Sequence, residues 1–215
     1  KGTIVSFGCF TECWNEDVRN LTIDMLLYFI NKGNYIQIAT KEYIQKEDIE
    51  FLSRNLKYQN QVTINVSLPV FKDAIWIEPY AERVKTRIRN FEYNKKYNID
   101  TILYIKPVLE NITIGDLDTY IKLISEYQLK VVVGNFLSVQ KDMNTEYQMV
   151  GNRKMWLKDT NQQKEIVKQL SKITMVYENS TEVIEEYRRI ISNTFKKHEV
   201  GLEQDIINKI STNLY

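Results

Sequence analysis

The sequence predicts an α/β fold: a partial (β/α) barrel of parallel strands, followed by a mainly helical C-terminal part. Short runs rich in β-branched residues alternate with longer amphipathic stretches, which is the pattern of strand, helix and parallel strand. The 215 residues, 43% of them apolar, suffice for one sizeable core. A closed barrel takes about 250 residues and eight strands, so an incomplete barrel or an open sheet is expected.

The parallel strands are expected in five β-branched runs. These runs are Ile4–Phe7, Tyr35–Ala39, Val62–Ser67, Thr101–Ile105 and Lys130–Val133. Their nearly unbroken apolar character predicts a sheet that is covered on both faces.

The crossover helices are indicated by apolar residues at helical spacing between the strands. The three sets are Leu21, Met25, Tyr28 and Phe29; Val84, Ile88 and Phe91; and Leu117, Ile121 and Ile124.

After Gly134 the pattern changes, and Ser138–Asn152 is expected to be a long loop. A last strand is expected within Ile173–Tyr177. We therefore divide the chain into a barrel core, residues 1–137, and a C-terminal loop with helices packed on it, residues 138–215. The C-terminal helices are marked by Ile166, Leu170 and Ile173; by Val183, Tyr187 and Ile190; and by Leu202, Ile206, Ile210 and Leu214.

Charge and composition exclude several classes of protein. A net charge of +1 gives no overall attraction to nucleic acid or to a membrane. The longest apolar runs are too short to span a bilayer, and no signal peptide opens the chain, so a cytoplasmic protein is expected. Neither GxGxxG nor GxxxxGK is present, which argues against nucleotide binding by those loops.

Polar residues at strand ends are the candidates for chemistry, because the carboxyl ends of parallel strands converge on one mouth. Lys106 stands out, since it interrupts an apolar run and a cation there suits an anionic group such as a carboxylate. The alternative is an ion pair with Glu12 or Glu78. The strand-end residues are Cys9, Thr11, Glu12, Thr40, Lys41, Ser67, Lys106 and Asn135.

Arg83, Lys85 and Arg87 occupy the early turns of a helix that follows Glu78. Helix starts favour acidic side chains, so these cations indicate another purpose. Carboxylate binding is one interpretation, and a solvated face with a salt bridge to Glu78 is the other.

The spacing Cys9-x₃-Cys13-x₂-Glu16 covers two-thirds of a cysteine motif for an iron–sulfur cluster. Such clusters are normally held by thiolates, and a carboxylate is a hard ligand for a site that selects soft ones. We therefore interpret Cys9 as a strand-end residue near the site and Cys13 as a loop residue. The single histidine, His198, lies in a charged tail, which argues against a histidine-based site.

The order of these fragments resembles the radical S-adenosylmethionine (SAM) proteins similar to spore photoproduct lyase, over about residues 3–137. In that group a threonine-acid-aromatic loop follows the second barrel strand, a TK pair ends the third strand and a serine ends the fourth. An EP loop then precedes a helix that bears an arginine, and a proline ends the fifth strand. The matching fragments here are Ser6–Trp14, Leu21–Thr22, Ile38–Lys41, Val66–Ser67, Ile77–Pro79, Arg87–Ile88 and Tyr104–Val108.

The resemblance implies an enzyme with a radical-SAM barrel that binds SAM and a [4Fe–4S] cluster. The cluster ligands, a CxxxCxxC loop, would lie upstream of Lys1. Such an enzyme takes an electron from a donor and forms a 5′-deoxyadenosyl radical, for lyase or other radical chemistry on a substrate not yet known. The substrate could include nucleic acid, and no membrane partner is implied.

The resemblance also implies roles for particular residues. Ser67, Arg87 and Lys106 would contact the methionyl carboxylate or the ribose, with Glu78 orienting Arg87. Thr40 and Lys41 would lie at the barrel mouth near SAM. Cys9 and Glu12 would face the substrate and are the catalytic candidates.

The chain departs from the group in three ways: the cluster cysteines are absent, Glu12 replaces the usual Asp, and Cys13 and Trp14 replace Pro and Tyr. The alternative function is therefore a non-catalytic module on a degenerate barrel that binds a ligand or nucleic acid. A nucleic-acid surface could use cations with aromatic neighbours. The residues concerned are Arg83, Lys85, Arg87 and Arg89 with Tyr80, Phe91 and Tyr93.

Overall fold

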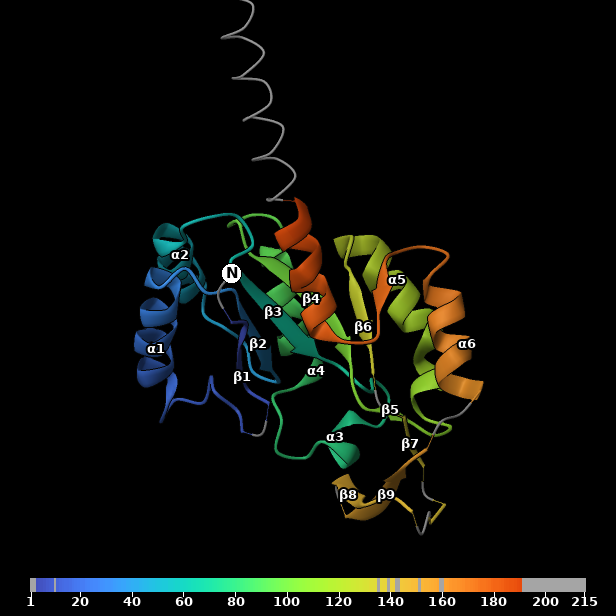
Figure 1. Cartoon of the computed structure of the whole chain (residues 1–215). Coiled ribbons are helices and arrows are strands. Elements are labelled where there is room, and N and C mark those ends of the chain that lie inside the picture. Colours follow the sequence, from blue (N-terminus) through green and yellow to red (C-terminus); the bar gives the residue numbers. More distant parts are fainter. Residues whose placement is uncertain are drawn as a thin grey trace, which may run out of the picture.

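A computed structural model of the chain describes residues 3–9, 11–134, 136–138, 140–141, 144–150, 152–158 and 161–190. Its main sheet has six parallel strands in the order β1-β2-β3-β4-β6-β10 (Figure 1). These are β1 (Val5–Phe7), β2 (Ile36–Thr40), β3 (Val62–Ser67), β4 (Asp100–Ile105), β6 (Val131–Val133) and β10 (Val176–Tyr177). The predicted partial barrel of parallel strands is confirmed, including the strand expected within Ile173–Tyr177.

Helices connect the strands as the sequence predicts. The longer ones are α1 (Arg19–Asn31), α2 (Lys46–Asn55), α5 (Leu117–Tyr127) and α6 (Asn161–Leu170); α3 (Ala74–Ile77), α4 (Val84–Ile88) and two 3₁₀ turns, Arg89–Tyr93 and Thr113–Asp116, are shorter. Residues 180–190 are also helical. The sequence analysis missed α2 because most of its residues are polar or charged, and only Ile49 and Leu52 among its apolar residues are buried.

The two faces of the main sheet are covered differently. Outward residues such as Ile38, Ile64 and Leu103 join the main core with side chains from the crossover helices. On the inner face, Ile102 and Val132 pack against the helix at residues 180–190, which lies across the sheet (Figure 1, red).

The nearly unbroken apolar character expected of the strands does not hold for β2 and β3, in which side chains alternate between the two faces. Apart from Thr40 at the end of β2, the outward residues of these two strands are apolar, whereas their inward residues are largely polar. The polar inward residues are Gln37, Thr63, Asn65 and Ser67.

The predicted loop at Ser138–Asn152 is also wrong. This stretch contributes to a second sheet of order β5-β7-β9-β8. Its strands are β5 (Val108–Leu109), β7 (Phe136–Ser138), β8 (Tyr147–Val150) and β9 (Arg153–Leu157). The β8–β9 hairpin lies with α3 beyond the edge where the parallel strands end (Figure 1). Because β8 is mostly exposed on both faces, its sequence lacks the alternating pattern of a half-buried strand.

The helix α1 was predicted correctly, but its buried face was not. Leu21, Met25 and Tyr28 are 61%, 42% and 58% exposed, whereas Leu26 and Ile30 are fully buried. Apolar residues lie on both faces of α1, so the spacing determined the helix without determining the face that meets the sheet.

Three further expectations lie outside the described residues: the strand-end Asn135, His198 and the helix marked by Leu202 to Leu214. The division at residue 137 stays a prediction, and β10 of the C-terminal part pairs with β6 of the core. Within the described part of the chain, no helix combines the length and hydropathy needed to cross a membrane.

Candidate functional site

A cavity of about 600 Å³ opens on the inner face of the sheet, where β1 to β4 end. It brings together six predicted site residues: Cys9, Glu12, Thr40, Lys41, Ser67 and Lys106. The other two, Glu78 and Arg87, are absent from its described lining. Residues that the sequence analysis did not select also line it, among them Gly8, Gln37, Ala39, Asn65, Tyr104, Pro107, Gln148 and Ser180.

Gly8 permits the loop after β1 to pass close to β2. Its φ is +78°, a conformation that side chains disfavour, and a Cβ atom there would lie 1.9 Å from the carbonyl oxygen of Ala39. The close passage of this loop places Cys9 in the cavity lining.

The carboxylate of Glu12 is engaged in holding the same loop. It accepts hydrogen bonds from the backbone N–H groups of Trp14 (3.0 Å) and Lys41 (2.8 Å), and from the Thr40 hydroxyl (2.7 Å). Glu12 thus connects the loop after β1 to the end of β2. This arrangement suits a positioning role.

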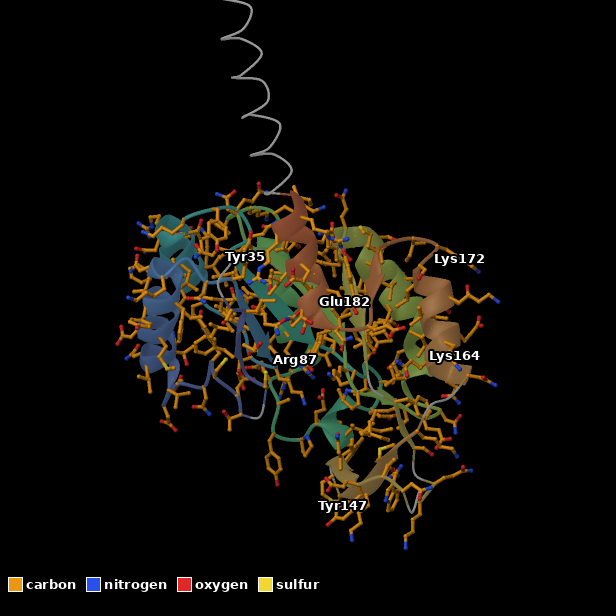
Figure 2. All side chains as sticks on the ribbon, viewed as in Figure 1. Tyr35, Arg87, Tyr147, Lys164, Lys172 and Glu182 are labelled. Carbon is orange, nitrogen blue, oxygen red and sulfur yellow. The ribbon has the colours of Figure 1, made fainter. Side chains whose placement is uncertain are left out.

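Arg87 lies behind the cavity wall. It is 1% exposed, and its Nη1 donates to the Ser67 carbonyl oxygen and to Oε2 of Glu78, both at 2.8 Å. Lys41 Nζ lies 2.8 Å from the other Glu78 oxygen. The predicted pairing of Arg87 with Glu78 is present, and the pair supports the ends of β2 and β3. Figure 2 shows Arg87 near the end of the sheet, well separated from Tyr147 of the hairpin.

Lys106 offers the cavity a cation without a counter-ion. Among the described residues it has neither an ion pair nor a hydrogen bond, and its Nζ lies 5.9 Å from the centre of the Tyr104 ring. The alternative ion pair with Glu12 or Glu78 is not formed, because other groups engage both carboxylates. The half-buried ammonium of Lys106 can therefore bind an anionic group that enters the cavity.

Gln37 and Asn65 are lining residues that the sequence analysis missed. They are 7% and 2% exposed. Gln37 Nε2 donates to the Ser6 hydroxyl at 2.6 Å, and its Oε1 is buried without a partner among the described residues. The Asn65 side chain likewise has no hydrogen-bond partner in the described part of the chain. The alternation Thr63-Ile64-Asn65-Val66-Ser67 was the signal that could have identified Asn65.

Two protein groups favour their neutral forms: the Tyr104 hydroxyl, which lines the cavity, and the buried Cys13 thiol. Burial raises the pKa of the Tyr104 hydroxyl, and a nearby Cys9 thiolate would raise it further. Burial, with the charge of Glu12, raises the pKa of Cys13 to about 12. Cys13 is therefore a core thiol, whereas Cys9 is exposed.

These two cysteines do not fit a [4Fe–4S] cluster, because Cys13 belongs to the main core while Cys9 faces the cavity. Among the described residues, no group of three His, Cys, Asp or Glu side chains could hold a metal ion.

A second cavity of about 740 Å³ adjoins the first, with Glu12, Lys41, Pro107 and Gln148 lining both. Exposed apolar side chains from the segment around α3 and from β8 line it. These are Ile75, Trp76, Tyr80 and Met149.

The nucleic-acid surface proposed on the arginine-bearing helix is not available in full. Arg87, Phe91 and Tyr93 are at most 4% exposed, so none of them can contact a nucleic acid. Arg89 is exposed, but its guanidinium stacks on Tyr43 at 4.4 Å.

The fold is similar to that of several solved structures. Spore photoproduct lyase complexed with dinucleoside spore photoproduct has a TM-score of 0.57 and 9% identity, and the match covers 81% of this chain and 60% of that one. Streptococcus suis SuiB bound to S-adenosylmethionine has a TM-score of 0.54 and 13% identity over 81% and 38%. A second crystal structure of Streptococcus suis SuiB gives the same TM-score, identity and coverage.

At the level of sequence, no family model matches the chain and no curated protein is significantly similar to it. The chain spans 38–60% of the length of the solved structures above. At these identities the likeness concerns the fold. The predicted likeness to the radical SAM, spore-photoproduct-lyase-like group is thus confirmed at the level of the fold.

Proposed function

We propose that this chain is the SAM-binding core of a radical SAM enzyme. The observation that carries the proposal is Lys106, an unpaired cation in a cavity where parallel strands end, with Ser67 in the same lining. An unpaired lysine at this position suits a ligand that brings its own carboxylate, as the methionyl part of SAM does. The fold shared with SuiB, whose structure was solved with S-adenosylmethionine, supports this choice.

The residues divide into contact and positioning groups. Lys106 would hold the carboxylate and the Ser67 hydroxyl would bind a polar group of SAM. Arg87, Glu78 and Lys41 would position the strand ends through the ion pairs that they form with one another. Thr40 and Glu12 would hold the loop that carries Cys9, and the Cys9 thiol is the catalytic candidate on the substrate side.

SAM, when bound beside a reduced [4Fe–4S] cluster, supplies a 5′-deoxyadenosyl radical. The described residues do not provide the cluster ligands, so another segment would have to supply them, and a separate electron donor would be required. A nucleic-acid substrate is supported by the fold of spore photoproduct lyase alone.

The experiment is a calorimetric titration of SAM into the wild-type chain and the Lys106→Met variant. Methionine keeps the length of the side chain and removes its charge, so affinity should fall about tenfold or more. Lys72→Met is the matched control, because Lys72 Nζ is exposed and donates to the Gly115 carbonyl oxygen outside the cavity. Equal affinities for wild type and Lys106→Met, or no binding to wild type, would reject the proposal.

A further inference from the structure

The inner face of the main sheet is apolar where a helix covers it and polar where the cavity lies. Under residues 180–190, the sheet presents Ile102 and Val132. Under the cavity it presents Gln37, Asn65 and Ser67. A strand face that packs against protein normally carries apolar side chains, so the polar half is suited to water or to a polar ligand in the cavity.

The hydrogen bonding of two of these side chains is incomplete. Gln37 is 7% exposed. Its Nε2 donates to the Ser6 hydroxyl, and its Oε1 is an acceptor without a partner among the described residues. Asn65 is 2% exposed, and both ends of its carboxamide lack a partner among the described residues. Leaving a buried acceptor such as Gln37 Oε1 unpaired costs free energy, and a ligand that pairs it recovers that free energy.

The register of the strands makes Gln37 and Asn65 diagonal neighbours. Gln37 lies opposite Thr63, and Ala39 lies opposite Asn65, so the two carboxamides arise about 8 Å apart on one face. Together they offer an acceptor from Gln37, and both a donor and an acceptor from Asn65. A ligand that carries an N–H and a C=O side by side can pair with both residues at once.

We propose that Gln37 and Asn65 bind a lactam edge of the substrate, that is, a cis-amide with its N–H and C=O on the same side. An ordinary trans peptide points these two groups in opposite directions and cannot pair both. The inference rests on the proposed function, since it assigns a substrate class to the cavity that would hold SAM.

The charges around the site favour an uncharged ligand. Glu12 is engaged by three hydrogen bonds, and Lys106 is assigned to the SAM carboxylate. In the adjoining cavity the charged lining consists of Glu12, Glu42, Glu78 and Lys41, and Glu78 is paired with both Lys41 and Arg87. The carboxylates of Glu12 and Glu42 would repel a polyanion there, whereas a neutral lactam would not be repelled.

The test uses small lactams and the full chain. Cyclo(Gly-Gly) presents the cis-amide edge, its N,N′-dimethyl derivative lacks the N–H donors, and uridine presents a similar edge on a pyrimidine. Dissociation constants are measured by NMR titration in the presence of SAM. We expect cyclo(Gly-Gly) or uridine to bind at least about tenfold more tightly than the dimethyl derivative. Tighter binding of cyclo(Gly-Gly) than of uridine would indicate that the substrate is a cyclic amide, and tighter binding of uridine would indicate that it is a pyrimidine base.

Variants link this binding to the two residues. Gln37→Leu and Asn65→Leu should each weaken lactam binding about tenfold, whereas Thr63→Val should not. Thr63 is the matched control because it lies on the same face of β3, buried and outside the described cavity lining. Should a leucine variant fail to fold, Gln37→Met removes the acceptor at similar side-chain length and Asn65→Asp removes the N–H donor at the same size, and the same loss is expected.

Two failures are distinguishable on the same samples. Wild-type protein that binds SAM but no lactam, or binds the dimethyl derivative equally well, overturns the present inference. Equal lactam affinity in wild type and both carboxamide variants overturns it as well. Wild-type protein that does not bind SAM overturns the proposed function instead.

Discussion

Two cations that the sequence places in the same role behave differently in the structure. Lys106 faces the cavity without a counter-ion, whereas Arg87 is buried between the Ser67 carbonyl and Glu78. Lys106 could be predicted because it interrupts an apolar run at a strand end. The burial of Arg87 could not, since it depends on a carboxylate nine residues earlier that folds back against it.

Removing the charge of Arg87 should destabilise the fold. In Arg87→Met, Glu78 keeps its contact with Lys41, but a buried carboxylate and the Ser67 carbonyl oxygen lose their main partner. We expect the free energy of unfolding, measured with urea, to fall by about 3 kcal/mol. Arg89→Met is the control, because Arg89 is exposed and should cost less than about 1 kcal/mol. Equal losses in the two variants would show that the buried pair contributes nothing specific.

The position of Gln37 and Asn65 in the cavity lining could not be predicted from the sequence. Each is a polar residue inside a strand, and strand position alone does not say whether the inward face meets a helix or a cavity. That distinction depends on where residues 180–190 pack, far away in the sequence. The alternation of polar and apolar residues in β3 was the one sequence signal that indicated a polar inward face.

At the scale of elements, the periodicity of apolar residues predicted the strands of the main sheet and most helices. It did not always predict which face of an element is buried. The five predicted strands all form, because β-branched runs between amphipathic stretches are a strong signal. The exposed Leu21, Met25 and Tyr28 on α1 show that a helix with two apolar faces leaves its orientation open. The β8–β9 hairpin was missed because β8 is mostly exposed, so no buried face imposes an alternating pattern on it.

The close approach of the first loop to β2 can be isolated with two glycines. Gly8 and Gly33 have nearly the same φ, +78° and +77°, but only Gly8 has a neighbour that a Cβ would strike. Gly33→Ala should therefore cost only the backbone penalty of about 1–2 kcal/mol. Gly8→Ala should cost clearly more and should also weaken SAM binding, because the loop must move away from Ala39.

The two variants are compared by urea unfolding and by SAM titration. A Gly8→Ala variant as stable as Gly33→Ala, with unchanged SAM affinity, would mean that the loop tolerates displacement and does not shape the cavity.

At the scale of the whole molecule, the buried hydroxyls and thiol make the fold sensitive to alkali. Burial raises the pKa of Cys13 and Tyr58 to about 12, and it raises the pKa of Tyr120 and Tyr187 as well. The unfolded chain releases these protons at lower pH than the folded chain does. Stability is therefore fully present below about pH 9 and declines as the pH rises above it.

The measurement is the free energy of unfolding by urea from pH 8 upward. Cys13 alone should contribute a decline of about 1.4 kcal/mol per pH unit above its ordinary pKa of 9.0. Cys13→Ala should show a correspondingly shallower decline just above pH 9, whatever its stability at pH 8. Parallel curves for wild type and variant would contradict the burial of this thiol.

The most direct test of SAM binding at the strand ends is an NMR map of the amides that shift when SAM is added to the full chain. Binding at the proposed site predicts that the largest shifts fall on Gly8, on Thr40 and Lys41, on Ser67 and on Lys106. Those positions are far apart in sequence and meet only around the first cavity. Shifts confined to α1 or to the β8–β9 hairpin, or no shifts at saturating SAM, would contradict it.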